Sequence, residues 1–218
     1  MHPPNPKAQK GWYSRGYIPH FDYQDALQFI TFRLADSLPQ QKLHQLKQAQ
    51  LLSLSTMCER QMIERWLDTG YGCCALGHPA LAEVMQQTLC KFDRLRYRLI
   101  AWCIMPNHVH VLIDPKEALG KIVQSWKSYT GRWALKRNAE LGLGVPGEKL
   151  WMRDYWDRYI RDETHYMQAV DYIEKNPVKA GLCKSPEDWP WSSARFRKHG
   201  ALPGTPSPSS AAEPEKNT

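Results

Sequence analysis

The feature that most constrains the fold is a pair of apolar segments joined by a tight turn in the middle of the chain. Residues Tyr97–Ile104 are apolar at nearly every position, which is typical of a strand covered on both faces. Residues Met105–Asn107 supply turn-forming types, and His108–Ile113 returns as a second apolar run that Asp114–Pro115 closes. We therefore expect an antiparallel hairpin at the centre of a sheet.

The segments on either side supply further elements. Residues Phe29–Leu34 alternate in polarity, which predicts a half-buried strand with Thr31 and Arg33 on its polar face. An α+β fold follows from helices interleaved with this strand and the hairpin. The expected helices cover Gln40–Leu67, a segment from Pro79, a segment from Leu119, and a last helix from an N-cap at Asp162 to Asn176, where Pro177 disfavours helical geometry.

Composition narrows the class of partner and the compartment. Lysine and arginine number 29 against 22 acidic residues, so the formal charge of +7 favours nucleic acid as a partner. No stretch approaches the roughly 18 consecutive apolar residues that a membrane span needs, so no membrane is expected. Six cysteines without a CxxC pair or a secretory leader predict reduced thiols in a cytoplasm. The pair Cys73–Cys74 with His78 does not match zinc-ligand spacing.

The two ends of the chain differ in composition from its middle. Residues 201–218 are mostly Pro, Ser, Ala, Glu and Gly, and residues 1–10 are similar, so both are predicted to be flexible. The remaining length suits one domain at about residues 11–200.

The second strand of the hairpin carries the clearest chemical signal. Alternate residues of a strand project to one face, so His108 and His110 point the same way while Val109 and Val111 pack on the other side. Two imidazoles placed in this way are able to share a divalent ion. A His-x-His pattern also arises by chance, so the pair needs support from elsewhere in the chain.

That support comes from the last predicted helix. Tyr172 and Asn176 lie four residues apart and therefore share a helix face. The commoner use of these types is structural, with a tyrosine at an amphipathic boundary and an asparagine at a helix end. Three other tyrosines, Tyr155, Tyr159 and Tyr166, also remain as candidate nucleophiles.

These features occur together in an order that resembles the REP-associated tyrosine transposases, which belong to the HUH group of single-strand nucleases and transposases. The resemblance covers most of residues 11–197. It rests on Gly11–Gly16, Met105–Asn107, His108–His110, Trp151–Arg153, Asp157–Glu163, Asp171–Gly181 and Asp188–Ser193.

The resemblance implies the HUH fold, a ferredoxin-like or palm-type antiparallel sheet of four or five strands with helices packed against it. It implies that His108, His110 and Asn176 bind Mg²⁺ or Mn²⁺ and that Tyr172 is the nucleophile. The implied activity is that of a DNA transposase: site-specific cleavage and rejoining of single-stranded DNA at REP hairpins, through a 5′-phosphotyrosine. The implied location is the bacterial cytoplasm, with the protein associated with the nucleoid.

Single-stranded DNA is expected to contact aromatic and cationic side chains. For each aromatic, a place in the protein core is the commoner alternative. By resemblance, the N-terminal stretch reads a guanine-containing tetranucleotide 5′ of the hairpin. The candidate contacts are Trp12, Tyr13, Arg15, Arg33, Lys127, Arg132, Trp151, Arg153, Trp156, Arg158, Arg161 and Lys179.

Two other functions fit the same motifs. A non-catalytic REP-binding protein would share the basic and aromatic residues, and a metal-dependent hydrolytic endonuclease would share the metal ligands. The resemblance favours a monomer and leaves a dimer open. Residues 40–77 look like an expansion relative to shorter relatives, and their role is not evident from the sequence.

Overall fold

The computed structural model describes the backbone at residues 11–14, 19–22, 26–39, 41–42 and 56–197, and the side chains at residues 26–39, 41–42 and 62–197. The predicted tail at 201–218 and the predicted flexible residues 1–10 lie outside these ranges. No helix in the described ranges is long and apolar enough to cross a membrane.

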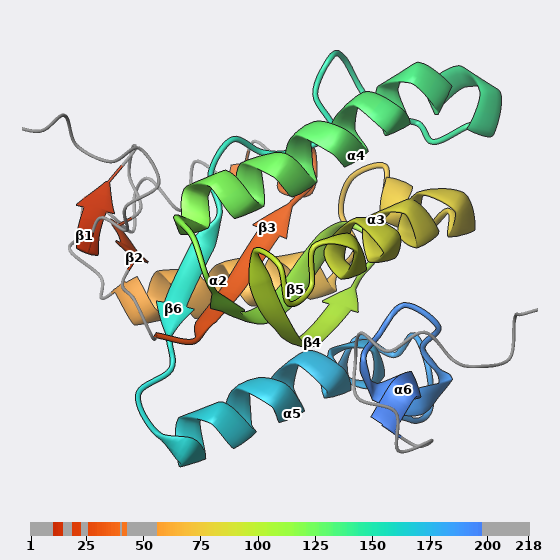
Figure 1. Cartoon of the computed structure of the whole chain (residues 1–218). Coiled ribbons are helices and arrows are strands. Elements are labelled where there is room, and N and C mark those ends of the chain that lie inside the picture. Colours follow the sequence, from red (N-terminus) through yellow and green to blue (C-terminus); the bar gives the residue numbers. More distant parts are fainter. Residues whose placement is uncertain (1–10, 15–18, 23–25, 40, 43–55, 198–218) are drawn as a thin grey trace, which may run out of the picture.

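A four-stranded antiparallel sheet forms the centre of the molecule (Figure 1), with strand order β4-β5-β3-β6. The predicted hairpin is confirmed as β4 (Tyr97–Ile104) and β5 (His108–Pro115). Strand β3 (Gln28–Arg33) pairs with β5, and β6 (Trp156–Tyr159) forms an edge that the sequence did not predict. The sheet with its helices is the α+β architecture expected for the HUH group. Strands β1 (Gly11–Ser14) and β2 (Pro19–Asp22) pair separately.

One face of the sheet packs against α3 (Pro79–Lys91) and α4 (Leu119–Leu141), which carry the two predicted apolar stripes. The strands contribute mainly apolar side chains to the shared core. Its strand residues include Ile30, Phe32, Leu34, Trp102, Ile104, Val109, Val111 and Ile113.

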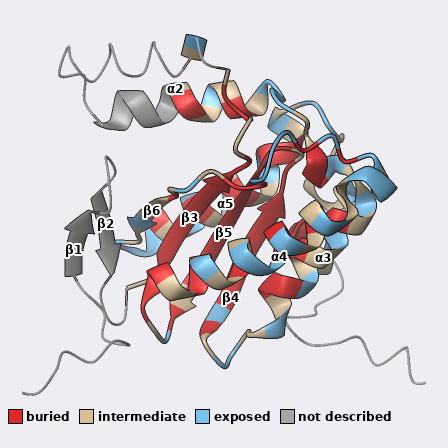
Figure 2. Ribbon diagram, turned by 90° about the horizontal axis from the view of Figure 1, so that it is seen from above, coloured by how far each residue is buried: buried red, intermediate tan, exposed pale blue. Residues whose placement is uncertain are grey.

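The other face of the sheet is also covered. Helix α5 (Glu163–Lys179) packs over β4 and β5, and α2 (Thr56–Asp68) packs beside β3 and β6. The prediction of a half-buried β3 is therefore wrong: Thr31 is 3% exposed and Arg33 is 4% exposed, because both helices shield their face. Figure 2 shows the central strands buried along nearly their whole length.

The predicted end of the last helix is also corrected. The N-cap is confirmed, since Asp162 accepts a hydrogen bond from the backbone N–H of His165 at 2.7 Å. However, α5 continues past Pro177 to Lys179. Pro177 has no N–H to donate within the helix, but the backbone pattern continues after it, since the Ala180 N–H bonds to the Asn176 carbonyl at 2.9 Å. Strand β5 likewise extends through Pro115, beyond its predicted end.

The C-terminal segment ties α5 to the edge of the sheet. It contains η2 (Pro186–Asp188) and α6 (Ala194–Arg197). The Trp189 indole donates to the carbonyl of Ile104 at 2.9 Å. The Ser193 hydroxyl lies 2.7 Å from Glu174 of α5 and 3.3 Å from the carbonyl of Trp102. The Asp188–Ser193 motif thus fixes α5 relative to β4.

Candidate active site

The two histidines of β5 lie on the face covered by α2 and α5, as the strand alternation predicts. Both side chains are 1% exposed. Their Nε2 atoms are 3.0 Å apart, so the two rings converge on one point.

Each histidine is held through its other ring nitrogen. The Asn107 amide donates to the carbonyls of Leu67 and Tyr71, both at 3.1 Å, which leaves its oxygen to accept from His108 Nδ1 at 2.7 Å. His108 is therefore protonated on Nδ1 and keeps a lone pair on Nε2. Thr31 Oγ1 lies 2.8 Å from His110 Nδ1, and this hydroxyl is able to serve either tautomer of the ring.

Asn176 joins the histidines from α5. Its Nδ2 lies 3.3 Å from His110 Nε2, and the residue is 1% exposed. Its Oδ1 is buried and has no hydrogen-bond partner in the structure. The amide oxygen and nitrogen exchange places by a rotation of the side chain, which brings an oxygen ligand towards the imidazoles.

These groups fit a divalent cation. Ligand atoms at adjacent corners of an octahedron with bonds of about 2.1 Å are about 3.0 Å apart, which is the spacing of the two Nε2 atoms. Burial lowers the pKa of His108 to about 3, so this ring is neutral and able to donate its lone pair. The described residues contain no group of three His, Cys, Asp or Glu side chains. Among the side chains beside the two histidines, the Asn176 amide could supply a third ligand.

Tyr172 lies one helical turn before Asn176. Its ring centroid is 5.4 Å from that of His110, at an interplanar angle of 76°. Phe29 contacts both rings: its ring centroid is 5.7 Å from that of His110 and 5.9 Å from that of Tyr172. The hydroxyl oxygen of Tyr172 is buried.

The other candidate tyrosines are placed differently. Tyr155 is buried in the core on the opposite face of the sheet. Tyr159 pairs with Gln28 on the edge strand β6, and Tyr166 packs with the cluster below α5. Tyr172 is the candidate whose ring contacts a histidine of the converging pair.

Lys179 adds a cation beside the tyrosine. It lies on the same face of α5 as Tyr172 and Asn176, seven and three residues later in the chain. Its Nζ is 5.5 Å from the centroid of the Tyr172 ring and 3.2 Å from Asp68 Oδ2 of α2. The segment at 40–77 therefore contributes to the walls of the site.

Two of the predicted DNA contacts are corrected by their burial. Trp151 is 7% exposed, packs against Phe32, and donates its indole N–H to Thr130 at 2.9 Å, so it is a core residue. Arg33 is 4% exposed and lies over the Trp156 ring at 5.8 Å. Burial lowers the pKa of Arg33 to about 10. Neither side chain presents a surface on which a base could stack or to which a phosphate could bind.

The remaining predicted contacts lie at several surfaces. Arg132 and Arg153 are exposed along an open groove beside α4, where Lys127 donates to the Arg153 carbonyl at 2.8 Å. Arg158 and Arg161 are exposed near β6, and Trp156 is partly exposed. Trp12 and Tyr13 lie on β1, but their side chains, and all of Arg15, are outside the described residues.

The sequence analysis gave no chemical role to two residues that hold the histidines. Asn107 was interpreted only as part of a turn, and its position directly before His108 was the available signal. Thr31 was assigned to a polar strand face, and no local pattern shows that this position lies opposite His110 across the sheet.

Comparison with known proteins shows a family similarity. Residues 76–176, a little under half of the chain, match the family model described as "Transposase IS200 like", and this range contains all four converging residues. This part of the chain is therefore similar to the IS200-like transposases.

Two curated relatives of the chain are named as REP-associated transposases. This chain is 28% identical over 112 residues to the REP-associated tyrosine transposase of Escherichia coli K12. The alignment covers 51% of this chain and 63% of the relative. The chain is 29% identical over 103 residues to a putative REP-associated tyrosine transposase of Haemophilus influenzae, which covers 44% and 58%. The matches thus span about three fifths of the relatives' length.

A solved structure has the same fold. It is described as a REP-associated tyrosine transposase bound to a REP hairpin. The superposition has a TM-score of 0.51 with 21% identity and covers 94% of this chain and 98% of that chain. It extends the similarity of the fold to the strands and helices outside residues 76–176.

Proposed function

We propose that this protein cleaves single-stranded DNA at REP-type hairpins and transfers the cut strand through a covalent bond to Tyr172. The observation that carries the proposal is the convergence of His108, His110 and Asn176 beside the Tyr172 ring, with Nε2 atoms 3.0 Å apart and ring centroids at 5.4 Å. The printed name of the E. coli relative and the hairpin bound by the structural relative support REP DNA as the substrate.

In this proposal, Tyr172 attacks the scissile phosphorus from the end of its buried ring. The new bond joins the tyrosine oxygen to phosphorus, and the bond from phosphorus to the 3′ oxygen breaks. The proton lost by the phenol is balanced by one gained at the 3′ oxygen, which leaves a 3′-hydroxyl and a 5′-phosphotyrosine. Attack by a later 3′-hydroxyl reverses these steps and rejoins strands without an external energy source.

Two chemical obstacles explain the surrounding residues. A phenol is a weak nucleophile at neutral pH, and a phosphodiester repels anions. A Mg²⁺ or Mn²⁺ ion bound by His108, His110 and Asn176 would withdraw charge from a non-bridging phosphate oxygen. Phe29 restricts the Tyr172 and His110 rings to one relative orientation, so the attacking atom is placed before the substrate arrives.

The four converging side chains all come from one chain. Helix α5 packs on the same chain's β4 and β5, so Tyr172 reaches the histidines of its own sheet. This arrangement supports action as a monomer. Exposed cations near β6 and beside α4, including Arg158 and Arg153, are proposed to bind the phosphates of the hairpin and of the single strand.

The proposal is tested by incubating the protein with single-stranded REP hairpin labelled at the 5′ or 3′ end, with Mn²⁺ or with EDTA, and separating the products on a denaturing gel. We expect a metal-dependent covalent adduct that retains the 3′ label, and no adduct from Tyr172→Phe. Tyr166→Phe, on the same helix, is the matched control and should form the adduct normally.

The other outcomes identify the alternatives. Cleavage without an adduct would contradict the proposal and indicate a hydrolytic endonuclease that uses water. Tight binding without cleavage, unchanged by metal and by Tyr172→Phe, would indicate a non-catalytic REP-binding protein.

A further inference from the structure

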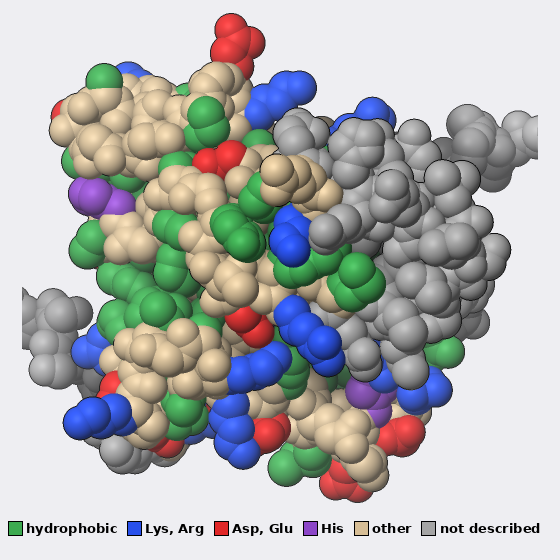
Figure 3. Space-filling view, turned by 180° about the vertical axis from the view of Figure 1, so that it is seen from behind, with side chains coloured by type: hydrophobic (Ala, Val, Ile, Leu, Met, Phe, Trp, Pro, Cys, Tyr) green, Lys and Arg blue, Asp and Glu red, His purple; other side chains and the backbone are tan. Residues whose placement is uncertain are grey.

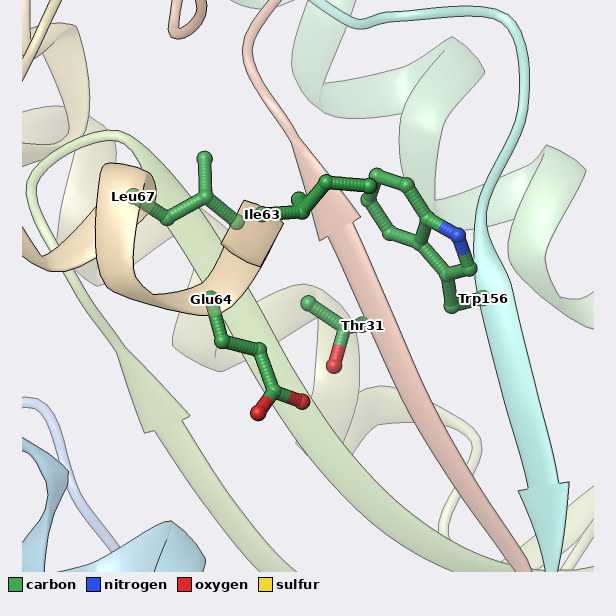
Figure 4. A pocket seen from close by; sticks show the side chains of 5 residues that line it. All are labelled: Thr31, Ile63, Glu64, Leu67 and Trp156. Carbon is green, nitrogen blue, oxygen red and sulfur yellow. The ribbon is translucent and has the colours of Figure 1, made fainter. Parts of the chain in front are cut away.

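Helix α2 brings a carboxylate to the edge of the candidate site. The side chains of Ile63, Glu64 and Leu67 face Thr31 and the Trp156 ring across a narrow gap (Figure 4). One turn after Glu64, Asp68 reaches Lys179 of α5 at 3.2 Å. Helix α2 therefore meets both β3, whose Thr31 contacts His110, and the helix that carries Tyr172.

Asp68 is placed where a carboxylate has few partners. Its side chain is 15% exposed, and its Oδ1 is buried without a hydrogen-bond partner in the structure. Burial is the main cause that raises its pKa, nearby Glu64 raises it further, and Lys179 lowers it. Lys179 is thus the favourable partner that offsets the cost of placing this carboxylate beside the site.

Lys179 is placed where a DNA phosphate would need a cation. Its side chain is 55% exposed, and its Nζ lies over the ring of Tyr172. In the proposed reaction Tyr172 must meet a DNA phosphate. The exposed Lys179 ammonium lies beside the Tyr172 ring, so a strand that reaches Tyr172 passes close to Lys179. Figure 3 shows the back of the molecule relative to Figure 1, where lysine and arginine side chains occur among polar and apolar surface.

The reactive groups are closed to solvent in this arrangement. His108, His110 and Asn176 are each 1% exposed, and the Tyr172 hydroxyl is buried. A bound strand must therefore displace a contact at the rim of the site before its phosphate reaches them. The Asp68–Lys179 pair lies at that rim, and its lysine is 55% exposed, so the ammonium is able to turn from Asp68 to another anion.

We propose that Asp68 occupies the place of a DNA phosphate in the free protein, and that Lys179 exchanges Asp68 for a backbone phosphate when a single strand enters the site. Asp68 is then an autoinhibitory residue of the site, and Lys179 is a phosphate-binding residue. This inference rests on the proposed function for the identity of the ligand, but its binding test does not require cleavage.

The first test measures binding of a fluorescent oligothymidylate to Asp68→Asn, Lys179→Met and the double variant over a range of salt concentrations. Asp68→Asn should bind about threefold more tightly, because the competing carboxylate is gone. Lys179→Met should bind more weakly, and its plot of log affinity against log salt should be shallower by about 0.7, the value for one phosphate contact on a single strand. The double variant should match Lys179→Met within about twofold, because Asp68 acts through Lys179.

A matched control separates this effect from net charge. The Arg98–Asp114 pair, at 3.4 Å with exposures of 61% and 33%, links β4 to the far end of β5 from His108. Asp114→Asn changes the charge of the protein by the same amount as Asp68→Asn and should leave the affinity within about twofold of the wild-type value. Thermal melting of each variant checks that the fold is retained.

The second test measures the rate of adduct formation with a REP hairpin below saturation. Asp68→Asn should be about threefold faster than the wild-type protein, in line with its affinity. A slower Asp68→Asn with unchanged binding would overturn the inference, since Asp68 would then position Lys179 for chemistry. Equal tightening of binding by Asp68→Asn with and without Lys179 would also overturn it. If the wild-type protein forms no adduct, the proposed function fails, and the binding test still decides the role of Asp68.

Discussion

The two faces of the central sheet are buried to the same extent but are built from different residues. On the face below α3 and α4, residues such as Phe32 and Val111 form a continuous apolar core. On the opposite face, His108, His110 and Arg33 are equally shielded, at 1%, 1% and 4% exposure. Burial therefore does not distinguish the core from the site. What distinguishes them is the chemistry of the side chains: the second face carries polar groups, and His108, His110 and Asn176 converge there on one point.

The apolar face should dominate stability, which gives the largest expected effect. Trp126 of α4 is fully buried, stacks with Phe32 and meets the Tyr97 ring edge-to-face. Replacing it by alanine removes a large buried side chain and leaves a cavity, so Trp126→Ala should lower the free energy of unfolding by about 3–5 kcal/mol in urea denaturation. A loss under about 1 kcal/mol would show that this face is not the main core of the fold.

The second face should dominate metal binding rather than stability. Asn107 holds His108 in the tautomer that leaves Nε2 free for an ion. Asn107→Ala should therefore weaken Mn²⁺ binding by about 10- to 100-fold in calorimetric titration, the usual cost of losing a residue that orients a metal ligand. Gln124 is an exposed polar residue of α4 on the other side of the sheet, and Gln124→Ala is the control that should bind Mn²⁺ normally. If Asn107→Ala bound Mn²⁺ with unchanged affinity, the assignment of His108 and His110 as metal ligands would be wrong.

Weakening the attachment of α5 to the sheet should have a smaller effect, on both stability and the rate of adduct formation. The Ser193 hydroxyl links Trp102 of β4 to Glu174 of α5. Ser193→Ala should cost about 1 kcal/mol in the free energy of unfolding, the scale of one buried hydrogen bond. It should also slow adduct formation, because α5 carries Tyr172. Lost stability with a normal rate of adduct formation would show that α5 keeps its position without this link.

The sequence predicted the parts of the site that depend on local periodicity. Alternation along a strand placed His108 and His110 on one face, and four-residue spacing placed Tyr172 and Asn176 together. Both expectations concern residues close in the chain, where geometry follows from the element itself. The convergence of the two pairs then depended on the resemblance to a known family.

The remaining features depend on contacts between distant segments. Aromatic side chains serve both in cores and in DNA binding, so composition could not show that Trp151 packs inside while Trp156 stays partly exposed. The contact of Asp68 with Lys179 joins residues more than a hundred positions apart. The end of α5 was misplaced because the bias that Pro177 places on Asn176 is only a preference, and in the structure Asn176 stays helical.

The central claim is that Tyr172 forms the bond to DNA beside the histidine pair. It is tested most directly by digesting the covalent adduct with trypsin and a nuclease and locating the remaining nucleotide by tandem mass spectrometry. The account predicts a nucleotide on Tyr172, formed only when Mn²⁺ or Mg²⁺ is present. A nucleotide on Tyr155, Tyr159 or Tyr166 would contradict it.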